Sequence, residues 1–427
     1  MSYANISRRR FVGATAAGLS LASMPFGRPA RAENKVIRIG FLAPLTGEVA
    51  GWGLPGLYGC QIWADEINAG GGVKIAGENY NLEFVGYDDE YMPDKSLQGA
   101  KKLVLEDGVK FVMMLGGDPI PATLPFFKDQ NMLVSTLAPS DLSPKFPNLV
   151  APAEVHPIYN VTGVDWLARN RPELKRAALC GQNDAIGLPS MATYRAAFKA
   201  AGIEVVYDEL FDIATTDFAP VMTAILAKKP DIICLDTAYP DFVNLLTEQA
   251  FLQGFKGQML SCTCDNYQNI IDKTSKEFME GFVFQFPDFD DPAMNQSQIN
   301  FKDPKAFYDS YVKQHPGSWS AVSWEYAAIG ELWLRAAQKA NSVEPEKVLA
   351  AMKEGGAGAH VFGQASWWGT ELFGVDNALV GNWPVVVIRN GKATIVEFAS
   401  VIAWWDKHKD VLIQELTAAG QMWNQRT

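Results

Sequence analysis

The sequence predicts an α/β protein built from two lobes, each a doubly wound parallel sheet. Short apolar runs alternate with longer amphipathic stretches, which favours parallel strands connected by helices on both faces of a sheet. A proline-rich passage interrupts this alternation at residues 138–157, and the alternation then starts again. The 427 residues are 48% hydrophobic and 20% charged, a composition that can bury a sizeable core in two or three domains.

Residues 1–32 are predicted to be an export signal that the mature protein lacks. Arg8 and Arg9 stand just before Phe11, an apolar stretch rich in Ala and Gly follows, and Ala30-Arg31-Ala32 offers cleavage after Ala32. The paired arginines resemble the twin-arginine (Tat) type of signal. We therefore expect the mature chain to be periplasmic.

In the first lobe the pattern predicts four strands and three helices. We expect Asp94 to be the N-cap of the second helix, after Pro93, and the run Gly70-Gly71-Gly72 to end the first helix. The predicted strands are 36–42, 82–87, 109–115 and 132–136, and the predicted helices are 55–69, 94–106 and 119–130.

The second lobe is predicted from the renewed alternation after the proline-rich passage. Its strands are expected at 176–180, 205–210, 232–236 and 258–260, and its helices at 187–201, 217–228 and 241–253. An acidic, turn-rich segment at 288–292 precedes two long amphipathic helices, 303–315 and 323–341. Asn390-Gly391 is the turn of a predicted hairpin, 383–389 with 393–398, and a last helix starts near 402.

Charge and hydropathy exclude several kinds of partner. Acidic residues outnumber basic ones 48 to 37, and residues 1–32 contribute five arginines and no acidic residue, so the mature chain is more acidic still. We expect no nucleic-acid binding. No later segment has the roughly 18 uninterrupted apolar residues of a membrane span, so direct membrane insertion is not expected either.

No motif points to catalysis, a metal or a cofactor. Residues 51–56 spell the dinucleotide pattern G-x-G-x-x-G, but eight residues separate them from the strand ending at Leu42, which favours a Gly-rich loop opening a helix. Asp88-Asp89-Glu90 has no neighbouring His or Lys and is interpreted as a solvated loop. The five Cys and four His lack the spacing of metal ligands, and Cys180 and Cys234 are interpreted as core residues. The chain is therefore predicted not to be an enzyme.

Several segments resemble one known family. The opening 37–47 reads IRIGFLAPLTG, and it is followed by Ala50-Gly51-Trp52-Gly53, by EINAGG at 66–71 and by Tyr87-Asp88-Asp89. This string closely resembles the opening of the type I periplasmic solute-binding proteins of the branched-chain amino acid (Leu/Ile/Val-binding-like) ABC-transporter class. The resemblance continues to residues 390–392, Asn-Gly-Lys.

The resemblance implies a periplasmic binding protein type I fold with discontinuous lobes. Three crossovers are expected near 153, 285 and 372. They divide the mature chain into an N-terminal lobe, 33–153 plus 286–372, and a C-terminal lobe, 154–285 plus 373–427. A small solute would bind in the cleft between the lobes, which close about a hinge. ABC permease subunits in the membrane would recognise the closed form, and the protein is expected to be a monomer.

The resemblance also nominates binding residues. Trp52 matches an aromatic residue that covers the ligand, and Tyr239 matches an aromatic wall of the second lobe. The loops that hold the ligand carboxylate in amino-acid binders correspond to Gly117-Asp118-Pro119 and Ala138-Pro139-Ser140. Ile186 and Asp265 complete the predicted set.

Departures from the family pattern leave the ligand open. Pro139 and Ile186 replace a hydroxyl residue and a tyrosine, Asp265 is offset from the family's ammonium-binding acid, and Tyr91 stands where the family has a disulfide cysteine. An amino acid, an amide and an aromatic or other organic acid all remain possible solutes. The expected function is solute binding for an ABC importer, and a ligand-sensing receptor lobe and a Tat-exported redox enzyme are kept as alternatives.

Overall fold

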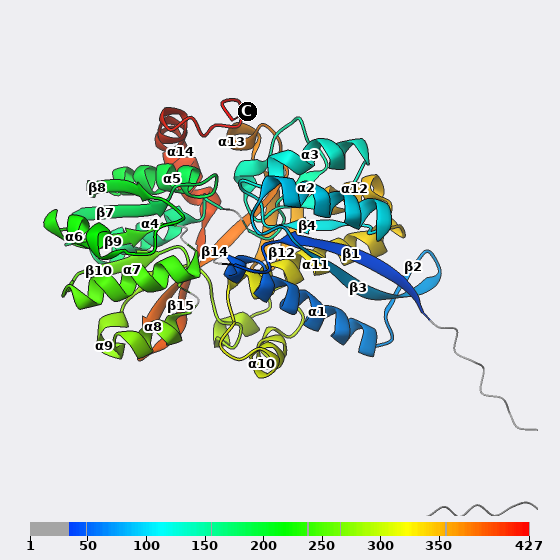
Figure 1. The fold of residues 1–427 in the computed structure, drawn as a ribbon, viewed down its shortest axis with the longest axis horizontal. Helices are drawn as coiled ribbons and strands as arrows, with labels where there is room; N and C mark the ends of the chain where they lie inside the picture. Colours follow the sequence, from blue (N-terminus) through cyan, green and yellow to red (C-terminus); the bar gives the residue numbers. More distant parts are fainter. Residues whose placement is uncertain are drawn as a thin grey trace, which may run out of the picture. The chain divides into compact units, whose positions relative to one another are not determined.

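The computed structural model describes residues 34–426, apart from Glu48, Val155, Thr237, Ala238, Asp265, Gly355 and Gly356. The predicted export signal, with Arg8, Arg9, Phe11 and Ala32, lies outside the described residues. Two sheets with helices on their faces form the fold, as Figure 1 shows. The α/β prediction is confirmed.

The first sheet has six strands in the order β2-β3-β1-β4-β5-β6. All neighbouring pairs are parallel except the β2–β3 hairpin. The helices α2 and α3 lie on one side of β1 and β3, and α1 lies on the other (Figure 1). The elements are β1 (Lys35–Ala43), the 3₁₀ turn η1 (Ala50–Trp52), α1 (Leu54–Ala69), β2 (Val73–Ile75), β3 (Glu78–Asp88), α2 (Pro93–Lys101), the π-helical η2 (Lys102–Glu106), β4 (Val112–Met114), α3 (Ile120–Asp129), β5 (Val134–Ser135), η3 (Pro139–Asp141) and β6 (Leu149–Val150).

The second sheet has nine strands in the order β12-β13-β14-β11-β10-β9-β7-β8, with β15 paired to β14. The strands β7 to β11 pair in parallel, and β12 to β15 pair antiparallel. Cys180 and Cys234 are fully buried in β7 and β9, as predicted. The strands are β7 (Arg176–Gln182), β8 (Glu204–Phe211), β9 (Ile232–Leu235), β10 (Gln258–Ser261), β11 (Val283–Phe284), β12 (Ala357–His360), β13 (Gly363–Trp368), β14 (Ala378–Arg389) and β15 (Lys392–Ser400).

Helices of the second half of the chain pack on both sheets. The long helix α11 lies against α1, and α14 lies against α5 (Figure 1). The chain therefore returns to its first lobe after β11 and reaches its second lobe again along β14. The helices are α4 (Asn160–Asn170), α5 (Gly187–Ala200), α6 (Ala219–Ala227), α7 (Pro240–Leu252), α8 (Tyr267–Lys273), α9 (Lys276–Met279), η4 (Pro292–Asn295), α10 (Pro304–Gln314), α11 (Ala321–Ala340), α12 (Pro345–Lys353), α13 (Thr370–Phe373) and α14 (Val401–Ala418).

Glycines let α1 and α11 approach closely. A Cβ atom at Gly59 would lie 1.8 Å from the carbonyl oxygen of Ser323, and one at Gly56 would lie 2.3 Å from the Tyr326 ring. Both glycines are buried on α1. The two helices are thus joined backbone to backbone, although about 260 residues separate them in sequence.

Three connections run between the lobes. The first follows β6, where Ala151 bridges to Ala378 at the start of β14. The second leaves β11 and contains the acidic segment predicted at 288–292. The third is the region of β14, which pairs with β13 in its first half and with β11 in its second half. We propose that the N-terminal lobe comprises residues 33–153 and 286–372, and that the C-terminal lobe comprises residues 154–285 and 373–427.

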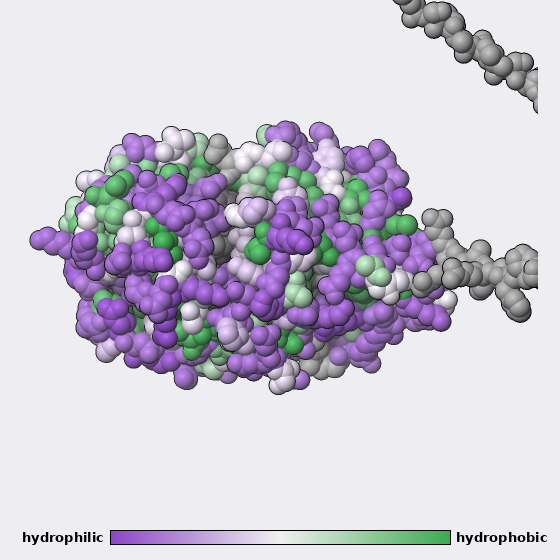
Figure 2. Space-filling view, turned by 90° about the horizontal axis from the view of Figure 1, so that it is seen from below, coloured by the Kyte–Doolittle hydropathy of each residue, from purple (hydrophilic) through white to green (hydrophobic). Residues whose placement is uncertain are grey.

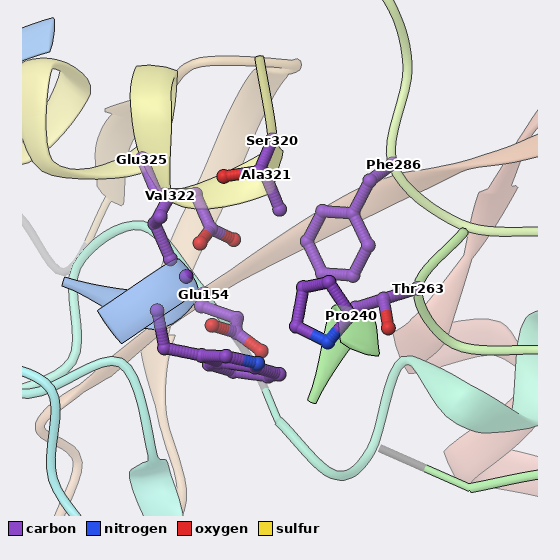
Figure 3. A pocket seen from close by; sticks show the side chains of 10 residues that line it. Glu154, Pro240, Thr263, Phe286, Ser320, Ala321, Val322 and Glu325 are labelled. Carbon is purple, nitrogen blue, oxygen red and sulfur yellow. The ribbon is translucent and has the colours of Figure 1, made fainter. Parts of the chain in front are cut away.

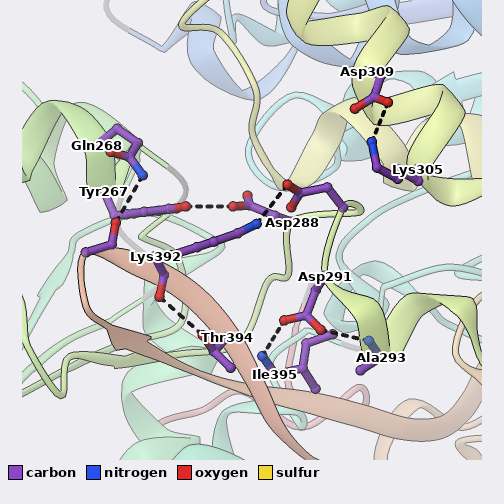
Figure 4. A network of polar contacts seen from close by, with 12 residues as sticks. Tyr267, Gln268, Asp288, Asp291, Ala293, Lys305, Asp309, Lys392, Thr394 and Ile395 are labelled. Carbon is purple, nitrogen blue, oxygen red and sulfur yellow. Dashed lines mark hydrogen bonds and ion pairs between the residues drawn. The ribbon is translucent and has the colours of Figure 1, made fainter.

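Polar contacts join the acidic segment to α8 and to the β14–β15 hairpin, as Figure 4 shows. Tyr267 donates a hydrogen bond to Asp288 at 2.7 Å, and Lys392 forms an ion pair with Asp290 at 2.8 Å. The backbone N–H of Ile395 donates to Asp291 at 2.8 Å. The second connection is therefore held to the second lobe immediately after it leaves β11.

Local differences from the prediction have physical causes. Asp94 was predicted as the N-cap of α2, and this was wrong: the helix begins at Pro93, and Met92 is the N-cap. Proline fits the first helical position, because its missing N–H would be unpaired there anyway. Gly70 is the C-cap of α1, as predicted. The sequence analysis did not predict the short strands β2, β6, β12 and β13, nor the helices α4, α8, α9, α12 and α13.

The surface is largely polar on the face drawn in Figure 2, where hydrophobic residues occur in small separate groups. Among the described residues, no helix combines the length and the apolar character that crossing a bilayer demands.

Candidate solute site between the lobes

Trp52 reaches the inner edge of the first lobe from the loop that follows β1. Gly53 permits the turn, because a Cβ atom there would lie 2.0 Å from the carbonyl oxygen of Pro44. Trp52 is 5% exposed. Gly53 and Gly56 therefore allow close packing at the start of α1, and the loop opens a helix as the sequence analysis predicted.

Tyr239 meets Trp52 from the second lobe. It precedes Pro240 at the beginning of α7, is 1% exposed, and donates its backbone N–H to the side chain of Gln182 at 3.0 Å. The ring centroids of Trp52 and Tyr239 lie 5.4 Å apart at an interplanar angle of 85°. This edge-to-face pair joins the two lobes, and the role of both rings in solute binding stays a prediction.

A buried carboxylate, Asp184, forms the second contact between the lobes. It is 5% exposed and accepts hydrogen bonds from the backbone N–H groups of Ile186 at 3.0 Å and Gly187 at 2.7 Å, at the start of α5. The hydroxyl groups of Tyr91 and Tyr239 donate to its other oxygen at 3.3 and 3.4 Å. Tyr91 belongs to the first lobe, so Asp184 ties the lobes together.

Tyr91 occupies part of the space between the predicted binding loops. Its ring centroid lies 5.9 Å from that of Tyr239, and its hydroxyl oxygen accepts the backbone N–H of Asp118 at 3.4 Å. A Cβ atom on Gly117 would lie 2.3 Å from this hydroxyl oxygen and 2.9 Å from Ile186. Gly117 and Ile186 thus face each other across the lobes, with Tyr91 packed between them and Tyr239.

The loops predicted to hold a carboxylate use much of their hydrogen-bonding capacity within the protein. Gly117 donates its backbone N–H to Asp141 at 3.2 Å, and Ala138 donates to the Thr136 hydroxyl at 3.0 Å. Pro139 has no N–H group. These loops therefore offer few backbone donors to a solute carboxylate.

Ser140 lies in a different groove from Trp52. Ser140 and Gly117 line a groove beside the C-terminal segment, together with Asp141 and Arg426. Burial raises the pKa of the Asp141 carboxyl to about 7, although the nearby Arg426 opposes this shift. Asp265, the last predicted residue, lies outside the described residues. The structure thus pairs Trp52 with Tyr239 and Gly117 with Ile186, and it places Gly117 and Ser140 along the groove beside the C-terminal segment.

A small cavity lies beside the Trp52–Tyr239 pair, where the connections between the lobes pass. It holds about 220 Å³ of empty space, its mouth included. Figure 3 shows Glu154 and Glu325 on one side of it and Phe286, Pro240 and Thr263 on the other. The full lining is Gly51, Trp52, Glu154, Pro240, Thr263, Phe286, Ser320, Ala321, Val322 and Glu325.

Several of these residues were missed by the sequence analysis. Glu154 and Phe286 belong to the first two connections, and Glu325 lies in the first turns of α11. The connections were predicted near 153 and 285, but no periodic pattern gives side-chain directions in irregular segments. Asp184 was also missed; its one sequence signal is an acidic residue just before a predicted helix, where the helix dipole favours negative charge.

Asp184 should make the contact between the lobes sensitive to pH. Burial raises its pKa from 3.8 to about 6, and nearby Asp118 adds to the rise, whereas the N–H groups of Gly187 and Ile186 and the Gln182 side chain oppose it. The pKa of Asp184 is higher in the folded protein than in the unfolded chain, so the protonated carboxyl stabilises the folded protein below about pH 3.8. This stabilisation is lost as pH rises through about 6.

We therefore expect Asp184→Asn to melt close to the wild type below pH 4 and at a higher temperature than the wild type near pH 8. Thermal melts at both pH values check this. Tyr91 and Tyr239, which face the carboxyl, do not ionise in this range, because burial keeps their pKa values well above the ordinary one. An offset that is equal at both pH values would contradict the expected ionisation.

Comparison with known proteins places this geometry in a family. The model of the family described as "Periplasmic binding protein" matches residues 36–393. The chain belongs to this family. The resemblance to the Leu/Ile/Val-binding class is confirmed, and so is the type I fold.

Curated relatives are Leu/Ile/Val-binding proteins. The chain is 29% identical over 225 residues to "Leu/Ile/Val-binding protein BraC3" of Rhizobium johnstonii, a match that covers 52% of this chain and 59% of the relative. It is 25% identical over 328 residues to the "Leucine-, isoleucine-, valine-, threonine-, and alanine-binding protein" of Pseudomonas aeruginosa, covering 74% and 82% of the two chains. These relatives are binding proteins rather than enzymes.

Solved structures share the fold at low sequence identity. An ABC-transporter solute-binding protein from R. palustris, in complex with 4-hydroxybenzoate, has a TM-score of 0.68 at 20% identity, covering 86% of this chain and 96% of that one. LivJ from Streptococcus pneumoniae, in complex with isoleucine, has a TM-score of 0.66 at 21% identity, covering 85% and 99%. The same fold thus carries both aromatic-acid and amino-acid ligands in other proteins.

Proposed function

We propose that the mature chain is the extracytoplasmic solute-binding component of an ABC importer. It captures a small organic solute between its lobes and presents it, as a monomer, to permease subunits in the membrane. The observation that carries this proposal is the pairing of Trp52 with Tyr239 across the lobes, beside a cavity that the connections between the lobes line. Closure of two rigid lobes about those connections would bury the solute.

Capture of the membrane partner tests this function. The mature protein, cross-linked to detergent-solubilised membranes of its own organism, should retain ABC permease subunits, and more of them when a solute is bound. Capture of a chemoreceptor or a sensor kinase in place of permease subunits would support the receptor alternative and contradict the importer proposal.

Export is proposed to follow the Tat route, because Arg8 and Arg9 precede Phe11. We expect the double substitution Arg8→Lys, Arg9→Lys to leave the full-length precursor in the cytoplasm. Cell fractionation and immunoblotting measure this outcome, with Arg28→Lys as the control, since Arg28 lies beyond the apolar stretch. Normal processing of the double variant would indicate that export does not depend on the paired arginines.

A further inference from the structure

Two carboxylates at the cavity are shielded from bulk water. Glu154 and Glu325 are each 1% exposed, and both line the cavity. The hydroxyl group of Tyr159 donates to Glu154 at 2.7 Å. Positive charge brought by a solute attracts buried carboxylates, in addition to the partners that they have within the protein. A solute that brings positive charge between these two side chains would be favoured by both.

Basic side chains are missing from the lining. None of the described residues that line the cavity is Lys, Arg or His. A solute carboxylate placed here would meet two acidic side chains and no basic one, and such like-charge contacts cost several kcal/mol. The loops that hold the carboxylate in amino-acid binders do not compensate, because Gly117 and Ala138 give their N–H groups to Asp141 and Thr136.

The indole of Trp52 provides an independent sign of a ligand. Its Nε1–H group is buried and has no acceptor among the residues that the structure describes, and the side chain lines the cavity. A buried donor without a partner is costly, and a solute acceptor would remove that cost. Trp52 and Phe286 also present aromatic surface, which attracts cations more strongly than neutral groups.

We infer that the solute is a small organic cation, such as a protonated amine or a guanidinium compound, whose N–H donors bind Glu154 and Glu325. An oxygen or nitrogen acceptor on the same molecule receives the Trp52 N–H group. This inference rests on the proposed function and narrows it, because it excludes simple carboxylic acids from the solutes that the sequence left open.

The experiment uses a small-molecule extract of cultured cells, separated at neutral pH into cationic, neutral and anionic fractions by ion exchange. Each fraction is incubated with the mature protein, which is then examined by native mass spectrometry. A single small-molecule adduct is expected from the cationic fraction. The adduct is next titrated against the wild type and the variants Glu154→Gln and Glu325→Gln.

Each variant is expected to bind the captured solute about tenfold to a hundredfold more weakly, because a charge-assisted hydrogen bond typically contributes about 1.5–3 kcal/mol. Glutamine keeps the size of the side chain and one acceptor oxygen, so the fold should be retained. Glu325→Asp provides a second variant if Glu325→Gln fails to fold. Glu331→Gln is the control, since Glu331 lies on the same helix, outside the cavity lining, and pairs with Arg335.

The outcomes separate the inference from the proposed function. Capture of an adduct from the anionic or neutral fraction, with affinity unchanged in both glutamine variants, would overturn the inference and leave the solute-binding function standing. Failure of all three fractions to give an adduct would contradict both. Weaker binding by Glu331→Gln to the same degree would overturn the assignment of the carboxylates, because a general charge effect would explain it.

Discussion

Replacing Trp52 by alanine is expected to weaken solute binding about thirtyfold, because a buried aromatic anchor at the centre of a contact typically contributes on the order of 2 kcal/mol. Tyr239→Ala should have a similar effect, since the two rings meet across the lobes at 5.4 Å. Trp52 contacts the partner lobe through this pair, so its loss should affect the closed form more than the folding of either lobe. Calorimetric titration with the captured solute measures the affinity.

Trp63→Ala is the matched control for this prediction. Trp63 is also 5% exposed, but it packs within the first lobe, against Phe84 and close to Gly330. We expect it to lower the melting temperature, since a large-to-small change of a buried aromatic costs about 3–5 kcal/mol, while the affinity of the folded protein is kept. Unchanged affinity in both Trp52→Ala and Tyr239→Ala would show that these rings do not form the walls of the site.

Gly59→Ala is expected to destabilise the contact between α1 and α11. The added methyl group would lie 1.8 Å from the Ser323 carbonyl oxygen, a backbone atom that cannot rotate away, so α1 and α11 must separate. Overpacking of this kind typically costs about 1–3 kcal/mol and occasionally more. The higher helix propensity of alanine, worth about 1 kcal/mol, offsets only part of that cost.

Thermal and denaturant unfolding measure this loss. We expect Gly59→Ala to melt several degrees lower than the wild type, and Gln61→Ala to melt within error of it, because Gln61 is exposed on the same helix. A Gly59→Ala protein as stable as the wild type would contradict the close contact between α1 and α11.

Hydrophobic periodicity and turn-forming residues were sufficient to predict most of the fold from the sequence. The alternation of strands and helices identified both sheets, and the Asn390-Gly391 turn located the β14–β15 hairpin. The antiparallel strands β12 and β13 could not be predicted, because both are short and each pairs with a strand that follows it in sequence. The N-cap of α2 was placed wrongly at Asp94, because proline occurs both in the turn before a helix and at its first position, and Pro93 occupies the first position.

The candidate site was less predictable than the fold. Trp52 and Tyr239 came from the family resemblance; the structure shows that their rings are in contact, and their role in binding stays a prediction. Glu154 and Glu325 carry no motif: each is a single acidic residue, and both line the cavity because the first connection passes the start of α11. Side chains of such segments are positioned by tertiary packing, which a local sequence pattern does not encode.

Small-angle X-ray scattering of the mature protein, with and without the captured solute, tests the central claim most directly. If the solute is held between two lobes that close about their connections, saturation should reduce the radius of gyration, and the Trp52→Ala protein at the same solute concentration should show a smaller reduction. An unchanged scattering profile of the wild type at saturating solute would contradict capture by closure of the lobes.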